Sequence, residues 1–234
     1  MEIKAYSYRF ANEILEHPLY QEVQGELFYI CSRCPIPVYE GKSSNQKSKD
    51  VVQQIMNTYF RLQFEAHGWE SEPLATPDAN EDELRADFRK TFPTADGKDI
   101  TVQIEVEFGN IASSYRNYFK FQLSFSYALT DICVLIVPSQ RLANRIDSGV
   151  SCYEKAIREI PQAKLSVTVP ILVVGLFDVD DDGNPVPEWN VRATGVSLEV
   201  AKNQRATVKD AHESLVQGYI DSISDETSET SDDT

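Results

Sequence analysis

Long apolar runs are missing from this sequence. No stretch approaches the ~18 apolar residues that a membrane-spanning helix needs, and no apolar segment follows the charged start Met1–Tyr6 as it would in a signal peptide. We therefore expect a cytoplasmic protein with no membrane segment. Hydrophobic residues at 41% and aromatic residues at 10% are ordinary for a folded domain, which excludes wholesale disorder.

Cysteine and histidine are both scarce, at four and three residues. Four cysteines are too few for a disulfide scaffold at this length. The Cys31-Ser32-Arg33-Cys34 pair suggests a zinc or redox site, but the histidines show no zinc-ligand spacing. A redox pair normally lies where a strand leads into a helix, whereas Pro35-Ile36-Pro37 follows here. We expect incidental thiols.

Basic residues are in the minority. The chain has 22 Lys and Arg against 37 Asp and Glu, a formal net charge of −15, whereas a DNA-binding protein is usually basic. The Ser/Thr-rich segment after Ile220 is acidic without any basic residue, and excluding it leaves about −9. Net charge governs solubility and non-specific attraction, so it does not forbid a local basic cleft or a metal-filled one.

The first part of the chain has helical spacing. Apolar residues recur at helical intervals over 8–30, with a break near Pro18, and again over 49–67 up to Gly68. The segment 70–82, with two prolines and many acids, predicts a loop.

The pattern changes after residue 85. A predicted strand over 86–92 is followed by the turn formers of 93–99 and by strict apolar–polar alternation over 100–108, which together predict a hairpin. The remaining predicted elements are a helix over 112–129, a buried strand over 132–138, helices over about 139–146 and 150–160, a second buried strand over 169–177, a loop over 178–205 with a turn at 180–185, and a helix over 207–220.

This order of elements predicts an α/β sandwich, in which helices flank a mixed central sheet. We expect a single domain over 1–220. It comprises N-terminal helices over 1–68, a core over 84–177 and a C-terminal extension over 178–220, and it is followed by a disordered acidic tail over 221–234.

Two glutamates, Glu105 and Glu107, share one face of the predicted strand 100–108. Side chains two positions apart on a strand lie about 6.5–7 Å apart. Two carboxylates that close repel unless a positive group lies between them or their pKa values split. Mg²⁺ takes one or two carboxylates and keeps waters, so the pair is a candidate metal site, with Asp87 on the partner strand as a third carboxylate.

Such a site suits hydrolysis of a phosphodiester. A metal held there would lower the pKa of a bound water and stabilise charge on the phosphate, and a glutamate not used by the metal can act as general base. The alternative is a plainly solvated strand face, which Thr101 and Gln103 on the same side also fit. The spacing alone leaves both interpretations open.

Neighbouring motifs connect this strand to a known family. The segment Ile104-Glu105-Val106-Glu107-Phe108-Gly109-Asn110 resembles the Glu-Val-Gln/Glu-Phe-Gly motif of the BglII/BstYI family of type II restriction endonucleases. Asp87-Phe88-Arg89-Lys90 is similar to the Asp-Phe-x-Lys strand that precedes it. Three further segments match in order: Tyr118–Gln122, Asp131–Pro138 and Ser148–Glu154.

The resemblance, from about 86 to 177, implies the PD-(D/E)XK nuclease fold, Mg²⁺, and a homodimer that cuts duplex DNA at a short palindromic site of GATC-containing type. It also implies a cognate DNA methyltransferase in the same host. Carried over by position, Asp87 and Glu105 hold the metal, with the backbone carbonyl of Val106 as another ligand. Glu107 falls where the family often has Gln, and a Glu there is similar to the BamHI arrangement, in which that residue is the proposed general base.

The sequence departs from the family pattern at the third acid. The family's first Asp usually lies closer to the glutamates, whereas Asp87 precedes Glu105 by 18 positions. We interpret 93–99 as an extended hairpin turn, and Asp96 or Asp99 remain alternatives to Asp87.

Five residues are candidates for contacts to DNA: Asn110, Lys120, Ser148, Gly149 and Ser151. The last three match the base-reading loop of the family in position, and hydroxyls or free backbone groups there can reach base edges or phosphates. Each has an ordinary alternative: a helix-capping turn for the loop, a strand-ending turn for Asn110, and a solvated helix face for Lys120. The aromatic residues of 112–129 are interpreted as core or dimer interface.

Two other functions remain open from the sequence. One keeps the fold and the metal in a DNA repair or defence nuclease that is not a restriction enzyme. The other is a catalytically inactive DNA-binding or interaction protein whose acidic pair is only solvated. The recognition sequence, the cut position and the number of metal ions do not follow from the sequence, because they depend on side-chain geometry.

Overall fold

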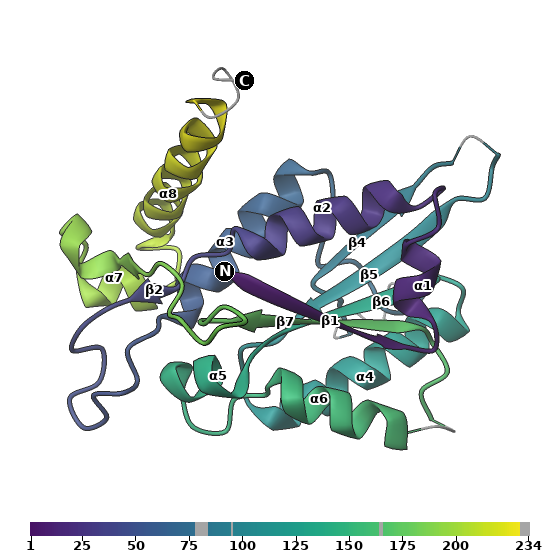
Figure 1. Cartoon of the computed structure of the whole chain (residues 1–234), viewed down its shortest axis with the longest axis horizontal. Helices are drawn as coiled ribbons and strands as arrows, with labels where there is room; N and C mark the ends of the chain where they lie inside the picture. The colour runs from purple at the N-terminus through teal and green to yellow at the C-terminus, as the bar shows by residue number, and fades with distance from the viewer. Residues whose placement is uncertain (78–83, 95, 164–165, 230–234) are drawn as a thin grey trace.

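A mixed sheet runs through the middle of the protein (Figure 1). The computed structural model describes residues 1–77, 84–94, 96–163 and 166–229. Across the sheet the strands are β1 (Glu2–Tyr8), β7 (Ile171–Phe177), β6 (Ile132–Pro138), β5 (Ile100–Val106), β4 (Phe88–Phe92) and β3 (Glu70–Ser71). The central strands β7, β6 and β5 are parallel, and the strands on either side pair antiparallel. The predicted α/β class, mixed sheet and β4–β5 hairpin are confirmed.

Helices cover both faces of this sheet. In Figure 1, α2 (Gln21–Ser32) and α3 (Gln53–Ala66) lie above it, whereas α4 (Ile111–Ser126) and α6 (Tyr153–Glu159) lie below. The buried strand β6 divides its side chains accordingly: Val134 packs with the core that contains α2 and α3, and Leu135 packs with the core that contains α4 and α6. Such alternation explains why β6 is apolar throughout, because both of its faces are buried.

Shorter elements complete the core region. α1 (Ala11–Leu15) follows β1, α5 (Gln140–Ile146) follows β6, and the 3₁₀ turn η1 (Ile160–Gln162) follows α6. At Gly175 in β7, an added Cβ would lie 2.6 Å from the ring of Tyr153, so α6 packs on the sheet at a distance that only glycine permits.

The C-terminal part folds back onto α3. β2 (Pro37–Val38) pairs in parallel with β8 (Trp189–Asn190), and η2 (Val191–Thr194), α7 (Leu198–Lys202) and α8 (Lys209–Glu229) follow. α8 is joined to α3 by the buried pair Thr58 and His212, whose Oγ1 and Nδ1 lie 3.0 Å apart. The extension is therefore packed against the core region, with the end of α8 projecting from it (Figure 1).

Three segments differ from the sequence predictions. The chain begins with strand β1 where a helix starting at residue 8 was the first predicted element; β1 is an edge strand with exposed Lys4 and Ala5, so its alternation is weak. The segment 70–82 contains the short strand β3, and 78–82 lie outside the described residues. α8 continues to Glu229, into the segment 221–234 that was predicted as a disordered tail. Residues 230–234 lie outside the described residues, and the disorder of the tail stays a prediction.

The four cysteines are free and buried, consistent with incidental thiols, and burial raises the pKa of Cys31 and Cys34. Within the described ranges, no helix is both long and apolar enough to cross a membrane.

Candidate active site

Asp87 and Glu105 meet at one end of the β4–β5 hairpin. Phe88 pairs with Ile104 in the strand register, so the residues just beyond them, Asp87 and Glu105, are brought opposite each other. The Asp87 Oδ2 accepts a hydrogen bond of 2.7 Å from the backbone N–H of Val106. Burial raises the pKa of Asp87, and this hydrogen bond and the charge of Lys120 partly oppose the rise.

Glu105 is almost completely buried, with 1% of its surface exposed. Its Oε2 pairs with the ammonium of Lys120 from α4, which also donates to the backbone carbonyl of Arg85 at 3.0 Å. Its Oε1 is buried without a hydrogen-bond partner among the described residues. Burial raises the pKa of Glu105 well above its usual value, the charge of Asp87 raises it further, and Lys120 opposes both. A solvated strand face is thus wrong for Glu105.

Glu107 lies just after β5 and is held at both oxygens. Its Oε1 accepts from the backbone N–H of Gly109 at 2.7 Å, and its Oε2 accepts from Nδ2 of Asn117 at 3.0 Å. Burial raises the pKa of this carboxyl, and the hydrogen bond from Gly109 opposes the rise. A fixed carboxylate whose pKa lies above its usual value is suited to accept a proton near neutral pH.

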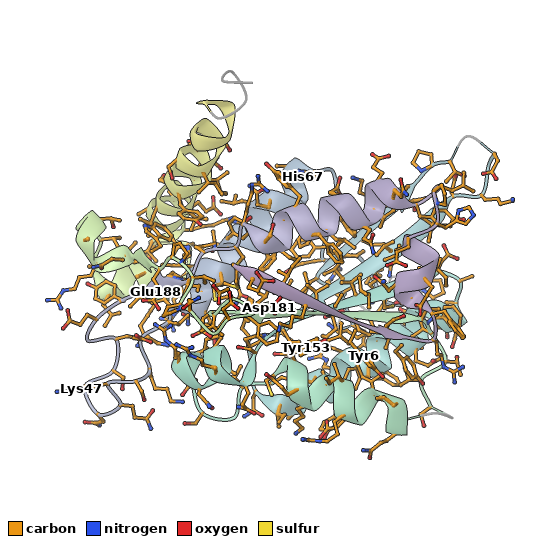
Figure 2. All side chains as sticks on the ribbon, in the orientation of Figure 1. Tyr6, Lys47, His67, Tyr153, Asp181 and Glu188 are labelled. Carbon is orange, nitrogen blue, oxygen red and sulfur yellow. The ribbon has the colours of Figure 1, made fainter. Side chains whose placement is uncertain are left out.

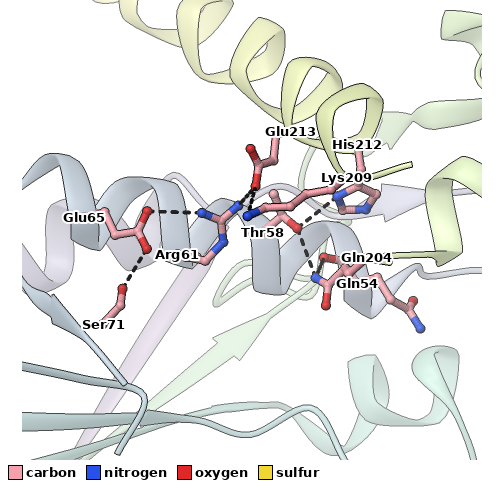
Figure 3. Close-up of polar contacts among 9 residues, drawn as sticks. All are labelled: Gln54, Thr58, Arg61, Glu65, Ser71, Gln204, Lys209, His212 and Glu213. Atoms are coloured by element: carbon pink, nitrogen blue, oxygen red, sulfur yellow. Dashed lines mark hydrogen bonds and ion pairs between the residues drawn. The ribbon is translucent and has the colours of Figure 1, made fainter. Parts of the chain in front are cut away.

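A groove of about 570 Å³ opens beside Asp87 and Val106. It runs between the hairpin edge, α3 and α8. One side of the groove is lined by the ion pairs shown in Figure 3, in which Arg61 on α3 pairs with Glu65 and with Glu213 on α8. The charged side chains along the groove are Arg61 and Lys209 against Glu65, Glu72, Asp87 and Glu213. The groove is therefore acidic, and a DNA phosphate would meet repulsion there unless a cation lies between.

The residues at this edge fit a hard divalent cation. Among the described residues, no three His, Cys, Asp or Glu side chains form a ready-made metal cage. Mg²⁺ does not need one, because it binds through one or two carboxylates and retains water ligands. Asp87 and the unpartnered Oε1 of Glu105 offer two carboxylates, with a backbone carbonyl beside them at Val106. The donor set suits magnesium rather than zinc.

Asp96 and Asp99 lie at the opposite end of the hairpin. Asp99 accepts from the backbone N–H of Thr94 and Asp96 pairs with Lys98, so both belong to the turn. From Ile100 to Glu105, a strand that rises about 3.3 Å per residue extends for about 16 Å. The structure thus brings Asp87, and neither turn aspartate, to the two glutamates.

The segment 148–151, which matches the family's base-reading loop in position and is here called the reading loop, lies next to Asn110. The backbone N–H of Ile111 donates to the carbonyl of Gly149 at 2.9 Å, and Asn110 forms an antiparallel bridge with Val150. Asn110 also caps α4, since its Oδ1 accepts from the N–H of Ala112 at 3.0 Å. Exposed Ser148 and Gly149 therefore share a surface with Asn110, a short distance along the chain from Glu107.

Two of the candidate DNA-contact residues are buried in the structure. Ser151 is buried, and its N–H bonds to the carbonyl of Gly109, so its hydroxyl is not presented at the surface. Lys120 is not on a solvated helix face; it points inward and pairs with Glu105. Its observed contact is with a candidate metal ligand, and a contact with DNA stays a prediction.

The sequence interpretation missed two residues at this site. Glu72 has a left-handed backbone, with φ of 52°, and its N–H bonds to the carbonyl of Asp87 at 2.9 Å. Its charge helps to raise the pKa of Asp87, and it lines the groove. The other is Asn117, one turn before Lys120 on α4. Only the high acid content of the segment 70–82 gave a signal for Glu72, and no pattern distinguished Asn117.

Comparisons with known proteins agree on one family. The family described as restriction endonuclease BglII/BglIII matches residues 3–176. The crystal structure of restriction endonuclease BglII complexed with a DNA 16-mer aligns with a TM-score of 0.58 at 20% identity, covering 77% of this chain and 78% of that one. The structure of free BglII aligns with a TM-score of 0.50 at 17% identity, covering 77% and 81%. No curated protein sequence matches. At these identities the structural matches establish a shared fold.

Proposed function

Because the chain belongs to the BglII/BglIII family of restriction endonucleases, we propose that it hydrolyses duplex DNA with Mg²⁺ held by Asp87 and Glu105. The single observation that carries this assignment is the buried acidic cluster at the end of the β4–β5 hairpin, in which an oxygen of Glu105 has no partner among the described residues and Asp87 lines the groove. An unpartnered buried carboxylate oxygen is costly unless a ligand satisfies it.

Each residue of the cluster has a distinct task in this proposal. Asp87 and Glu105 would hold the metal, with the backbone carbonyl of Val106 beside them. A magnesium ion bound there would lower the pKa of a water ligand and stabilise charge on the phosphate. Lys120 holds Oε2 of Glu105, which leaves Oε1 for the metal.

Glu107 is the proposed general base. The bonds from Gly109 and Asn117 fix its carboxylate, so that it accepts a proton from the attacking water as the oxygen–phosphorus bond forms. The bond from phosphorus to the leaving oxygen then breaks, with the leaving oxygen opposite the attacking water, and the leaving oxygen takes a proton from solvent water to become a hydroxyl. The products are one 5′-phosphate or 3′-phosphate end and one hydroxyl end on each cut strand.

The substrate proposed is a short palindromic site, of GATC-containing type, in double-stranded DNA. The DNA 16-mer bound to the similar BglII structure supports a duplex substrate. Exposed Asn110, Ser148 and Gly149 lie together beside Glu107 and are the proposed base-contacting groups. An enzyme of this kind needs a cognate methyltransferase in the same host to protect that site, and it would act in the cytoplasm, where the DNA is.

A homodimer fits the palindrome, because a two-fold axis presents the same groups to both strands. Tyr115 and Phe119 on α4 are exposed at 54% and 57%. They lie beside α6, since the Tyr115 hydroxyl donates to Glu159 at 3.2 Å. Exposed aromatic side chains gathered on one helix pair are typical of an interface. We place the dimer contact on α4 and α6.

Phe119→Asp is expected to shift the protein from dimer to monomer, because a buried unpaired charge at the contact is costly. Sedimentation equilibrium over a range of concentrations measures this. Tyr29→Asp is the matched control, since Tyr29 is an exposed aromatic residue on α2, which covers the other face of the sheet. A dimer that survives Phe119→Asp unchanged would contradict the placement.

Digestion of a plasmid in Mg²⁺ and in EDTA tests the proposed function. Discrete fragments that appear only with the metal are the expected result. A smear, or cuts at unusual DNA structures, would favour a repair or defence nuclease of the same fold. Intact plasmid at every concentration of divalent metal would favour a catalytically inactive protein.

A further inference from the structure

Lysines gather on one loop of this acidic protein. The segment 41–49, here called the lysine loop, contains Lys42, Lys47 and Lys49 and has no acidic residue, although the whole chain has a net charge of −15. It projects from the body below α7 in Figure 1, and Figure 2 shows Lys47 at its far end, away from the ribbon of the other elements. Such a concentration of positive charge is unexpected unless a negative partner binds there.

The base of the lysine loop is fixed to the segment that leads into the reading loop. The ammonium of Lys42 donates to the backbone carbonyls of Val51 and Ile146, the latter at 2.7 Å. The N–H of Val51 donates to the carbonyl of Arg145 at 3.2 Å. Ser148 and Gly149 follow Ile146 within three positions, so the lysine loop lies next to the exposed surface that Asn110 shares with the reading loop.

A fourth lysine joins this surface from the C-terminal extension. Lys202, at the end of α7, donates to the backbone carbonyl of Lys42 at 3.1 Å. Burial lowers the pKa of Lys42 to about 8, and the charges of Lys202 and Lys49 contribute, so these ammonium groups lie near one another. Only residues 3–176 match the family, so Lys202 comes from a part of the chain beyond that match.

Nearby acids do not neutralise the lysine loop. Asp50 is held by Arg145 through two hydrogen bonds of 3.0 Å each. Asp147, which raises the pKa of Lys42, also accepts from the N–H of Ser148. Within the described parts of the chain, Lys47, Lys49 and Lys202 form no ion pair with a carboxylate. Their ammonium groups are available to an external anion.

We propose that the lysine loop, with Lys202, binds backbone phosphates of the DNA next to the recognised base pairs. This inference rests on the proposed function, because it assumes that the reading loop faces duplex DNA. Phosphate contacts set the register and supply affinity without reading sequence. The catalytic groove is acidic and does not attract DNA phosphates by itself. The lysines would supply that electrostatic attraction instead.

The test is the salt dependence of DNA binding by Lys47→Ala/Lys49→Ala. Binding to a duplex is measured by fluorescence anisotropy at several salt concentrations, with Ca²⁺ in place of Mg²⁺. Each lost phosphate contact reduces the slope of log K against log salt by about 0.9, so the double variant is expected to reduce it by about 1.8. Its preference for the cleaved sequence over a scrambled one should not change.

Lys4→Ala/Lys98→Ala is the matched control, because it removes the same charge from lysines that pair with Asp181 and Asp96 elsewhere on the surface. The control should keep the wild-type slope. A lysine-loop variant whose slope equals that of the control overturns this inference, and leaves the proposed function standing if the plasmid is still cut. A wild-type protein that neither cuts nor binds duplex DNA overturns both.

Discussion

Glu105→Ala is expected to reduce DNA cleavage by about a thousandfold or more, which corresponds to about 4 kcal/mol of transition-state stabilisation. The variant loses the carboxylate that the proposed site offers to the metal through its unpartnered Oε1. Cleavage rates at saturating Mg²⁺ measure the effect, and DNA binding in Ca²⁺ shows whether the variant still docks. Binding should be largely kept, because Glu105 is buried and far less accessible than the reading loop.

The turn aspartates provide matched controls for this result. Asp87→Ala should lose activity to a similar degree, because Asp87 lies opposite Glu105 in the hairpin. Asp96→Ala and Asp99→Ala should cut at close to the wild-type rate, since both side chains are hydrogen-bonded within the turn at the other end. A Glu105→Ala enzyme that cuts at the wild-type rate would contradict the catalytic role of Glu105. An inactive Asp99→Ala enzyme would contradict the choice of Asp87 over Asp99 as the third acid.

Lys120→Met is expected to destabilise the metal-free protein by about 3–5 kcal/mol, because removal of one partner leaves a buried charge uncompensated. Lys120 and Glu105 have side chains only 8% and 1% exposed, so solvent screens their interaction little. Denaturant unfolding in EDTA measures the loss. Lys120→Met/Glu105→Gln should recover much of the lost stability, since the second change removes the uncompensated charge of the Glu105 carboxylate.

The stability lost in Lys120→Met should depend on pH in a definite direction. Burial and Asp87 raise the folded-state pKa of Glu105 above its ordinary 4.5, and Lys120 opposes this rise. Without Lys120 the folded pKa rises further, so the folded protein keeps a proton that the unfolded chain has released. Stability then falls as the pH rises from about 4.5 towards the folded pKa. The deficit of Lys120→Met relative to wild type should therefore be small below pH 4.5 and grow above it.

An exposed ion pair provides the comparison. Lys98→Met, which breaks the solvent-exposed pair with Asp96, should leave the stability close to that of the wild type at any pH, because solvent screens an exposed pair. If Lys120→Met costs no more than Lys98→Met, the ammonium does not stabilise the Glu105 carboxylate, and the role given to Lys120 in orienting that carboxylate is wrong.

The predictability of the fold from the sequence varied with burial. Strands β6 and β7 are apolar on both faces and β5 alternates strictly, so their periodicity was unambiguous. β1 lies at the sheet edge with exposed Lys4 and Ala5, and its mixed pattern did not distinguish it from the helices that follow. β3 has only Glu70 and Ser71, which is too short for any period to show.

The candidate site was predictable where local pattern and family motif coincide. Spacing placed Glu105 and Glu107 on one strand, and the resemblance singled them out from a solvated face. Spacing could not show that Lys120, 15 positions later on α4, turns inward to Glu105, because helix rotation depends on packing between distant segments. The same holds for Asn117 and Glu72, whose roles arise only from tertiary contacts.

The most direct test of the central claim is to sequence the ends of the DNA fragments that the wild-type protein produces in Mg²⁺. A homodimer whose two Asp87–Glu105 sites each cut one strand predicts a single short palindrome, cleaved at symmetric positions on both strands, and no cleavage in EDTA. Fragment ends that share no sequence, or cleavage that persists without a divalent metal, would contradict it.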